Sequence, residues 1–372
     1  MIPGRSLLLA ILVAATGCSS ATPVSSSSPT GTTAPVELAS PTPDKGDHVT
    51  MLPVTTFGHM VVDPKTKHVF VSSPEGSAIV VLDYSANIVR TISNEAGADG
   101  MVVSGTSLYV ALSTAGAIDE ISTTQLSKIR TVTSGLVQPA DLVLAGGRLW
   151  TTTGACANWS TELVSVDLVT GATKTYPAPA SSNLSYCAAF AGSLAVPNLL
   201  LAWDHGLSPA TITEIDVSTG EPVVVVSRRE ETLGNLQGIA ITSDGSLFIT
   251  ASGAPYEFDE WRVSDLAQDG VIYPGMPYPI AVAVNGDGKI ACALWLPTGW
   301  TLREYLVGRP DHYLYSGAFG SQTNLVFARG LAFTPDGSRL LVVTGDQDIG
   351  QKTVIFNSLA ARSGSSLLAS RN

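Results

Sequence analysis

The sequence offers few side chains whose type and spacing could do chemistry. Its five histidines are scattered, and the most suggestive pair is Asp204 and His205, next to Trp203. Adjacency along the chain does not place two side chains in one site, so we interpret the histidines as structural or solvated. The chain has no Gly-x-Ser-x-Gly turn, Gly-rich phosphate loop or Cys-x-x-Cys-His segment. The sequence therefore predicts no catalytic residue, no metal ligand and no cofactor.

Three of the four cysteines, Cys156, Cys187 and Cys292, lie in the body of the chain. None of them has the spacing of a zinc site. If the protein is exported to an oxidising compartment, a disulfide between Cys156 and Cys187 is the best pairing, and two free thiols are the alternative. Cys292 lies in an apolar run, so we expect it to be a buried free thiol.

Aromatic residues gather in segments of the second half of the chain that also carry carboxylates. If these segments are loops on one surface, flat rings and carboxylates would suit a sugar, a peptide or a peptidoglycan fragment. The alternative is that each tryptophan packs in the core. The candidate ligand-binding residues are Trp203, Tyr256, Asp259, Trp261, Trp295 and Trp300.

A repeated hairpin must position these residues. The segment 238–251, Gly-Ile-Ala-Ile-Thr-Ser-Asp-Gly-Ser-Leu-Phe-Ile-Thr-Ala, returns as a near copy at 330–344. In both, apolar residues run into an Asp-Gly turn, and a second apolar run follows it. Such turns recur at intervals of 39 to 53 residues, at Thr66, Gly105, Gly146, Gly192, Gly245, Gly286 and Gly337. This is the period of a four-stranded blade, so we predict an all-β, seven-bladed β-propeller as one domain over residues 48–372.

The outer parts of the blades are predicted from third-strand signals at 79–83, 162–167, 212–216 and 353–356. A propeller must also close its ring with a strand from one end of the chain. Residues 48–53 and residues 367–369 compete for that place. We favour the N-terminal segment, because the composition changes from a polar tether to an ordered chain just before it.

The first blade closely resembles a known repeat. Val61-Val-Asp-Pro-Lys-Thr-Lys-His-Val-Phe-Val-Ser72, together with 79–83 and 89–92, is similar to the YVTN-type β-propeller repeat of bacterial envelope proteins. That resemblance implies a propeller fold and an extracytoplasmic setting, and it carries over no catalytic residue. The family contains binding proteins. We therefore expect a monomeric binding or scaffold module for an envelope protein or a cell-wall glycan.

The residue just before each first strand is expected to face the central channel. By our alignment these residues are Gly58, Asp99, Ala140, Tyr186, Gln237, Ile280 and Arg329. Asp99 is the one carboxylate among them, which is too few for an acidic metal cage, and an ion pair between Asp99 and Arg329 is possible. The Gln237-Gly238 and Arg329-Gly330 hairpins resemble the Asn-Gly hairpin of calcium-dependent lactonase propellers but lack the asparagine. A lyase or lactonase acting at the channel mouth is the alternative function.

The N-terminus has the features of an export signal. Arg5 precedes an apolar run from Leu7 to Ala15, about half of the roughly 20 residues that a membrane-spanning helix needs. The small residues before Cys18 resemble the lipobox of bacterial lipoproteins, which implies cleavage after Gly17 and a diacylglyceryl group on the Cys18 sulfur. Residues 1–17 would then be a signal peptide and residues 18–47 a Ser/Thr/Pro-rich tether. We expect a lipid-anchored, extracytoplasmic protein, and plain secretion is the alternative.

Composition agrees with a large packed body and argues against one class of partner. Hydrophobic residues make up 45% of the chain and charged residues 14%, and the formal net charge is −11 at pH 7. Such a chain can bury a large core, and its acidic surface repels phosphate backbones. We therefore expect no binding of nucleic acid.

Overall fold

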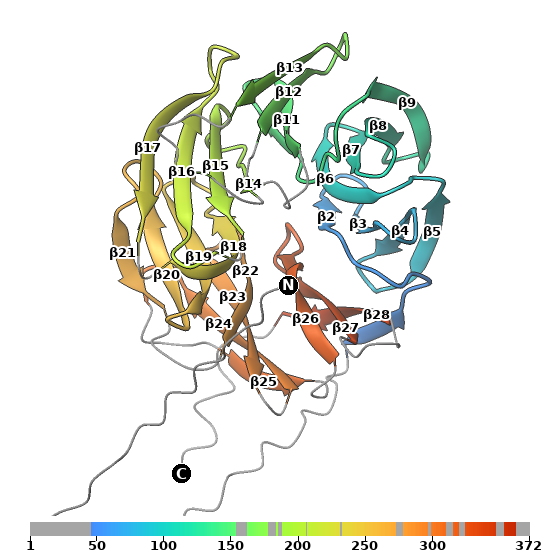
Figure 1. Cartoon of the computed structure of the whole chain (residues 1–372). Helices are drawn as coiled ribbons and strands as arrows, with labels where there is room; N and C mark the ends of the chain where they lie inside the picture. The colour runs from blue at the N-terminus through green and yellow to red at the C-terminus, as the bar shows by residue number, and fades with distance from the viewer. Residues whose placement is uncertain are drawn as a thin grey trace, which may run out of the picture. The chain divides into compact units, whose positions relative to one another are not determined.

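The structure is a computed structural model that describes residues 46–153, 162–177, 184, 188–205, 207–230, 233–272, 278–296, 299–309, 315–319, 324–346 and 353–361. The regular elements in these ranges are β-strands, and they form seven four-stranded antiparallel sheets. In Figure 1 the labelled first strands of the sheets lie toward a common centre and the labelled last strands lie at the rim. The fold is the predicted seven-bladed β-propeller.

Blades 1 to 4 are each built from four consecutive strands. Blade 1 holds β2 (Met60–Asp63), β3 (His68–Ser73), β4 (Ala78–Asp83) and β5 (Ile88–Ser93). Blade 2 holds β6 (Ala98–Ser104), β7 (Ser107–Leu112), β8 (Ala117–Ser122) and β9 (Ser127–Ser134). Blade 3 holds β10 (Val143–Ala145), β11 (Arg148–Thr153), β12 (Glu162–Asp167) and β13 (Thr173–Pro177). Blade 4 holds β14 (Ala188–Ala191), β15 (Leu199–Asp204), β16 (Thr211–Asp216) and β17 (Val223–Arg229).

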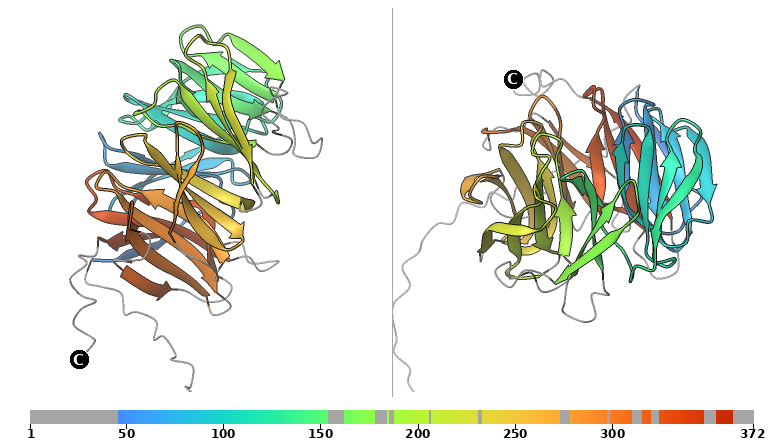
Figure 2. Two further views of the ribbon diagram at one scale, coloured as in Figure 1. Left: turned by 90° about the vertical axis from the view of Figure 1, so that its left-hand side faces the viewer. Right: turned by 90° about the horizontal axis from the view of Figure 1, so that it is seen from above.

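Blades 5 and 6 follow the same plan, and blade 7 joins the two ends of the domain. Blade 5 holds β18 (Gly234–Ile241), β19 (Leu247–Ala254), β20 (Glu257–Arg262) and β21 (Gln268–Val271). Blade 6 holds β22 (Tyr278–Val284), β23 (Lys289–Leu296), β24 (Gly299–Leu306) and β25 (Tyr315–Phe319). Blade 7 holds β26 (Asn324–Phe333), β27 (Arg339–Asp346), β28 (Val354–Ala360) and β1 (His48–Met51). Figure 2 shows these sheets from the side and from above.

The N-terminal strand closes the ring, as predicted. Strand β1 pairs antiparallel with β28, in a register that sets His48 opposite Ser358. Just beyond the strand, the Leu52 N–H donates to the carbonyl of Val354 at 2.8 Å. The competing segment 367–369 lies outside the described residues. Within those residues, no helix has the length and apolar character needed to cross a membrane.

The core is divided among the junctions between neighbouring blades. The buried apolar residues that the structure describes form seven clusters, and each cluster draws on two adjacent blades. The middle strands are therefore covered on both faces, and β4 buries its first five residues in succession. This explains why the sequences of such strands are continuous apolar runs and do not alternate between apolar and polar residues.

The predicted turns and third strands fall where the sequence placed them. All seven turns, from Thr66 to Gly337, lie between the first and second strands of their blades. Gly245 and Gly337, the glycines of the two near-identical hairpins, have φ of 72° and 66°, a left-handed conformation that side chains with a Cβ rarely adopt. The third-strand signals correspond to β4, β12, β16 and β28.

Bulges interrupt the pairing of several first strands near their N-terminal ends. The register shifts in β6, β18, β22 and β26. A bulge bends the strand and re-aims the side chains within it. The residues inside these shifts are Asp99 and Gly100, Gln237, Ile280, and Phe327 to Gly330. The shifts thus include four of the positions that the sequence alignment assigned to the channel.

Removal of β1 should destabilise the whole ring. A chain that begins at Pro53 loses the pairing with β28 and the hydrogen bond from Thr50 Oγ1 to the Ala86 carbonyl, 2.6 Å. At about 1 kcal/mol for each net hydrogen bond, we expect a loss of at least about 3 kcal/mol, read as a lower melting temperature in calorimetry. A chain that begins at Gly46 is the control. Equal melting temperatures for the two chains would contradict ring closure by β1.

Candidate functional site

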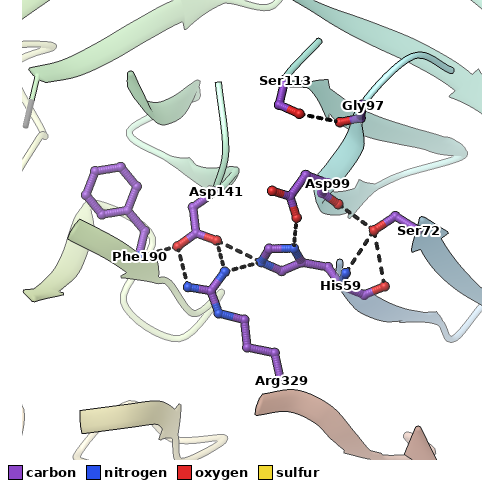
Figure 3. A network of polar contacts seen from close by, with 8 residues as sticks. All are labelled: His59, Ser72, Gly97, Asp99, Ser113, Asp141, Phe190 and Arg329. Carbon is purple, nitrogen blue, oxygen red and sulfur yellow. Dashed lines mark hydrogen bonds and ion pairs between the residues drawn. The ribbon is translucent and has the colours of Figure 1, made fainter. Parts of the chain in front are cut away.

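A cavity of about 560 Å³ lies between the first strands. Polar side chains from four blades meet beside it, and Figure 3 shows them in one network. His59 lies just before β2, Asp99 lies in the bulge of β6, Asp141 lies just before β10, and Arg329 lies in the bulge of β26. His59, Asp141 and Arg329 also line the cavity.

Each ring nitrogen of His59 is held by a carboxylate. Nδ1 lies 3.0 Å from Asp99 Oδ1, and Nε2 lies 2.7 Å from Asp141 Oδ1. Arg329 approaches Asp141 with both terminal nitrogens, since Nη2 donates to Oδ2 at 3.1 Å and Nη1 donates to Oδ1. The Phe190 backbone N–H donates to Asp141 Oδ2 at 2.7 Å. The network therefore connects blades 1, 2, 3, 4 and 7.

Local backbone and small side chains fix the geometry of this network. Ser72 accepts a hydrogen bond from the His59 backbone N–H at 2.8 Å and donates to the Asp99 carbonyl at 2.7 Å. A Cβ on Gly58 would lie 2.8 Å from Asp99 Oδ1, so glycine is required there for Asp99 to reach His59. Arg329 has φ of 66°, a left-handed conformation that costs a non-glycine residue about 1 kcal/mol or more.

The charges in the network compensate one another. Burial and the nearby Arg329 guanidinium, whose Nη1 contacts Nε2, both lower the pKa of His59. Hydrogen bonds to Asp141 and Asp99 outweigh them, and the net effect is a raised pKa. Burial would raise the pKa of Asp141, but Arg329 and His59 hold it well below its usual range. With both ring nitrogens occupied, His59 cross-links the blades and has no nitrogen free to transfer a proton.

Sequence reasoning found two members of this network and missed two. Asp99 and Arg329 were expected at the channel and do lie in the network, but the carboxylate paired with Arg329 is Asp141. The alignment assigned Gly58 and Ala140 to the channel, whereas the polar side chains belong to His59 and Asp141, one residue later. His205, from the pair singled out in the sequence, has a pKa lowered by burial and by Arg329.

The structure separates the aromatic candidates, and most of them lie in strands instead of loops. Trp203 in β15 and Trp261 in β20 are buried between blades 4 and 5, and Trp300 in β24 is buried between blades 6 and 7. Asp259 is also buried in β20, and burial together with Glu257 raises its pKa to about 7. These four side chains pack inside the propeller and do not form a surface site.

The two remaining candidates are exposed beside a groove. Tyr256, in the turn between β19 and β20, is 41% exposed, and Trp295 in β23 is 39% exposed. Trp295 is paired in register with Tyr278, whose ring packs edge to face with Tyr256 at 5.9 Å between centroids. The groove has a volume of about 460 Å³ and is lined by Gln237, Tyr278, Ile280, Trp295, Leu325, Val326, Phe327 and Ala328.

Glycine and amide side chains hold the groove in shape. A Cβ on Gly253 would lie 2.5 Å from the Tyr278 ring, so only glycine leaves room for that ring against β19. Asn235 Nδ2 donates to the Tyr278 hydroxyl, and Gln237 Nε2 donates to Asn235 Oδ1 at 2.9 Å. Phe327, on the other wall, stacks on Phe57 with centroids 5.1 Å apart.

In the part of the chain that the structure describes, the remaining cysteine and the possible metal ligands form no further site. Cys292 is a buried free thiol, and burial raises its pKa well above the usual value. Cys18, Cys156 and Cys187 lie outside the described residues. Among the residues that are described, no group of three or more His, Cys, Asp or Glu side chains is arranged to hold a metal ion.

Comparison with known proteins supports the fold. No family model and no curated protein matches this sequence. A hydrazine synthase structure from Kuenenia stuttgartiensis is similar, with a TM-score of 0.60 and 13% identity over 84% of this chain and 98% of that chain. A streptogramin B lyase structure has a TM-score of 0.62 and 12% identity over 84% and 98% of the two chains. The Cps50 (Swd1) β-propeller domain of Myceliophteria thermophila has a TM-score of 0.62 and 11% identity over 84% and 100%. At these identities the likeness shows the fold alone.

His59 should make the stability of the propeller depend on pH. Its pKa is raised in the folded state, so its contribution is complete below the ordinary value of about 6.5 and is lost as the pH rises through the folded value. We expect His59→Gln to remove this component from the pH dependence of the unfolding free energy, measured with urea between about pH 5.5 and pH 8.5. Asp141→Asn should lower the unfolding free energy by up to about 3 kcal/mol, because it leaves the half-buried Arg329 and His59 without the carboxylate that they share.

The difference between wild type and H59Q isolates this group, because carboxyls such as Asp259 titrate in both proteins. His48→Gln, at an exposed position of β1, is the control. An identical pH profile for wild type and H59Q would show that folding does not raise the pKa of His59.

Proposed function

We propose that this chain is a lipid-anchored, extracytoplasmic β-propeller that binds its ligand without catalysis, at the aromatic groove of blades 5 to 7. The ligand class we propose is a neutral saccharide, such as a segment of cell-wall glycan. The YVTN-type resemblance and the lipobox-like residues before Cys18 support the setting. The observation that carries the binding site is the groove of about 460 Å³ beside the exposed ring of Trp295.

The chemistry of the groove supports a saccharide. Tyr278, Trp295 and Phe327 offer aromatic surface, on which the apolar C–H face of a sugar ring can stack. Gln237 adds an amide that can pair with hydroxyl groups, and none of the described residues that line the groove is charged. A small number of polar groups on a mainly apolar wall is typical of small-molecule sites. A neutral ligand therefore fits this surface better than an ionic one.

The alternative, a lyase or lactonase at the channel mouth, stays a prediction. His59 and Asp99 lie close together there, but both ring nitrogens of His59 are already engaged. A substrate would have to displace one carboxylate before His59 could accept or donate a proton. Metal-dependent turnover of a lactone by the purified protein would establish this activity and would overturn the non-catalytic part of the proposal.

Truncation of Trp295 should weaken saccharide binding. The probe is an oligomer of four N-acetylglucosamine units, titrated calorimetrically. We expect Trp295→Ala to reduce affinity about thirtyfold, because loss of a central aromatic anchor costs about 2 kcal/mol. Leu194→Ala, at an exposed apolar residue outside the groove, is the matched control and should bind as wild type. Equal affinity of W295A and wild type would exclude the groove, and binding of peptides but not saccharides would exclude the ligand class.

The anchor should depend on the Cys18 sulfur. We expect the full chain to incorporate labelled palmitate and to partition into the detergent phase of a two-phase extraction, because acyl chains carry the membrane affinity. Cys18→Ser should abolish labelling and leave the chain in the aqueous phase. Cys292→Ser controls for loss of a thiol elsewhere. A mature N-terminus other than Cys18, determined by mass spectrometry, would contradict the proposal.

A further inference from the structure

Glu214 in blade 4 and Glu120 in blade 2 occupy the same position of their blades. Each is the fourth residue of a six-residue third strand, β16 and β8 respectively. In the outer strand, Val226 is paired with Glu214 and Arg130 is paired with Glu120. In both blades the register of this outer pair shifts directly after the glutamate. The surroundings of the two side chains can therefore be compared contact by contact.

Glu120 has a full set of partners. Arg130 Nε donates to its Oε2 and Ser107 Oγ donates to its Oε1, each at 2.7 Å. The Arg130 guanidinium also donates to a carbonyl in the turn between β12 and β13 of blade 3. Burial alone would raise the pKa of Glu120, but these contacts hold it below its usual value. Glu260, at the same position in blade 5, accepts a hydrogen bond from the Gly308 backbone N–H at 2.9 Å.

Glu214 lacks both kinds of side-chain partner that Glu120 has. Val226 stands where blade 2 has Arg130, and Leu199 stands where blade 2 has Ser107. Glu214 is 6% exposed, and its Oε2 receives no hydrogen bond from any residue that the structure describes. Because most buried polar groups in proteins are paired, this carboxyl group indicates that a donor is missing from its surroundings.

A pocket of about 350 Å³ opens beside Glu214, where the missing donor would be. Its volume lies within the roughly 300–1,000 Å³ typical of ligand sites. Glu214 and Asp216 both line it, and no cationic side chain does so within the described ranges. The rest of the wall is mainly aliphatic and comes from Val196, Pro197, Leu199 and Val225. The pocket thus combines carboxyl groups with a surface suited to an alkyl chain.

The charge of these carboxyl groups is poorly compensated. Burial, Asp216 and Asp265 raise the pKa of Glu214 to about 7. The two arginines in this region are engaged elsewhere, since Arg262 lies 2.8 Å from Asp265 and Arg228 lies 3.6 Å from a neighbouring glutamate. A cation in the pocket would favour the ionised form of Glu214, as Arg130 does for its own partner in blade 2.

We propose that this pocket binds an alkylguanidinium group, the chemistry of an arginine side chain, in the place that Arg130 takes in blade 2. The guanidinium pairs with the Glu214 carboxylate, and the alkyl stem lies on the aliphatic wall. Both an arginine of another polypeptide and a free guanidine carry this group. The pocket lies at the turns that join first to second and third to fourth strands, at the opposite end of the strands from the aromatic groove. The two sites are therefore independent.

The test titrates butylguanidinium into the protein by calorimetry at low salt. We expect saturable binding to wild type and none of butylurea, which has the same shape and no charge. Glu214→Gln should bind at least about tenfold more weakly, the effect of losing one charge-assisted hydrogen bond. Glu75→Gln, at an exposed position of blade 1, is the matched control and should bind as wild type. W295A should also bind as wild type.

A second variant fills the pocket from within. Val226→Arg gives blade 4 the arginine that blade 2 has, so it should abolish butylguanidinium binding. Val137→Arg adds the same charge at an exposed position and should leave binding unchanged. Affinity for wild type should increase between about pH 6 and pH 8, because the cation binds the ionised carboxylate and Glu214 has a pKa of about 7. E214Q should lack this increase.

Contrary results would overturn the proposal, provided that thermal unfolding shows each variant to be folded. These results are an absence of saturable binding, equal binding to wild type and E214Q, equal binding of butylurea, or tighter binding of butylammonium or Ca²⁺ than of butylguanidinium. E214Q keeps the side-chain volume, so the test does not depend on the folding of V226R. An acetylated and amidated Gly-Arg-Gly tripeptide distinguishes the sources. Tighter binding of this peptide than of butylguanidinium identifies a polypeptide, and weaker binding identifies a free guanidine.

Discussion

Burial of both faces of each sheet between neighbouring blades is the constraint on which the rest of this protein depends. A single four-stranded sheet of this composition would leave two apolar faces in water, and the blades remove that exposure by packing against each other around a circle. The seven clusters of described buried residues all lie between two blades, and none of them is confined to a single blade. The circle must therefore be complete, which explains why a short strand from the opposite end of the domain completes blade 7.

The same constraint leaves the inner edges of the first strands to carry polar groups. His59, Asp99, Asp141 and Arg329 come from different blades, yet their charges and hydrogen bonds are satisfied almost entirely by one another. These contacts link blades that are far apart in the sequence, at the propeller axis, where apolar packing between the blades has ended. The network also gives the cavity one polar end, while most of the other residues that line it are apolar.

The fold could be predicted from local patterns because each repeat contains the residue types that its turn and its strands require. The glycines at 245 and 337 mark turns that need a left-handed backbone, and the runs at 79–83 and 162–167 have the β-branched composition of buried strands. The aromatic site could not be located in the same way. A strand covered on both faces accepts tryptophan as readily as a loop does, so Trp261 and Trp300 gave the same signal as Trp295. The channel residues were displaced by one position at His59 and Asp141, because bulges and strand starts shift the register by single residues. The groove wall that Phe327 forms depends on a four-residue bulge in β26. No short-range sequence pattern predicts this bulge.

The bulges in the first strands have a consequence for how such a protein can diverge. Asp99, Gln237, Ile280 and Arg329 occupy positions where the hydrogen-bond ladder has already been interrupted, and of these four only Ile280 packs against a core cluster. Substitution at Gln237 changes the chemical character of the adjacent groove without removing a core contact. New specificities can therefore arise by single replacement at Gln237, whereas Asp99 and Arg329 must change together with His59 and Asp141, because removal of one member leaves a buried partner unpaired.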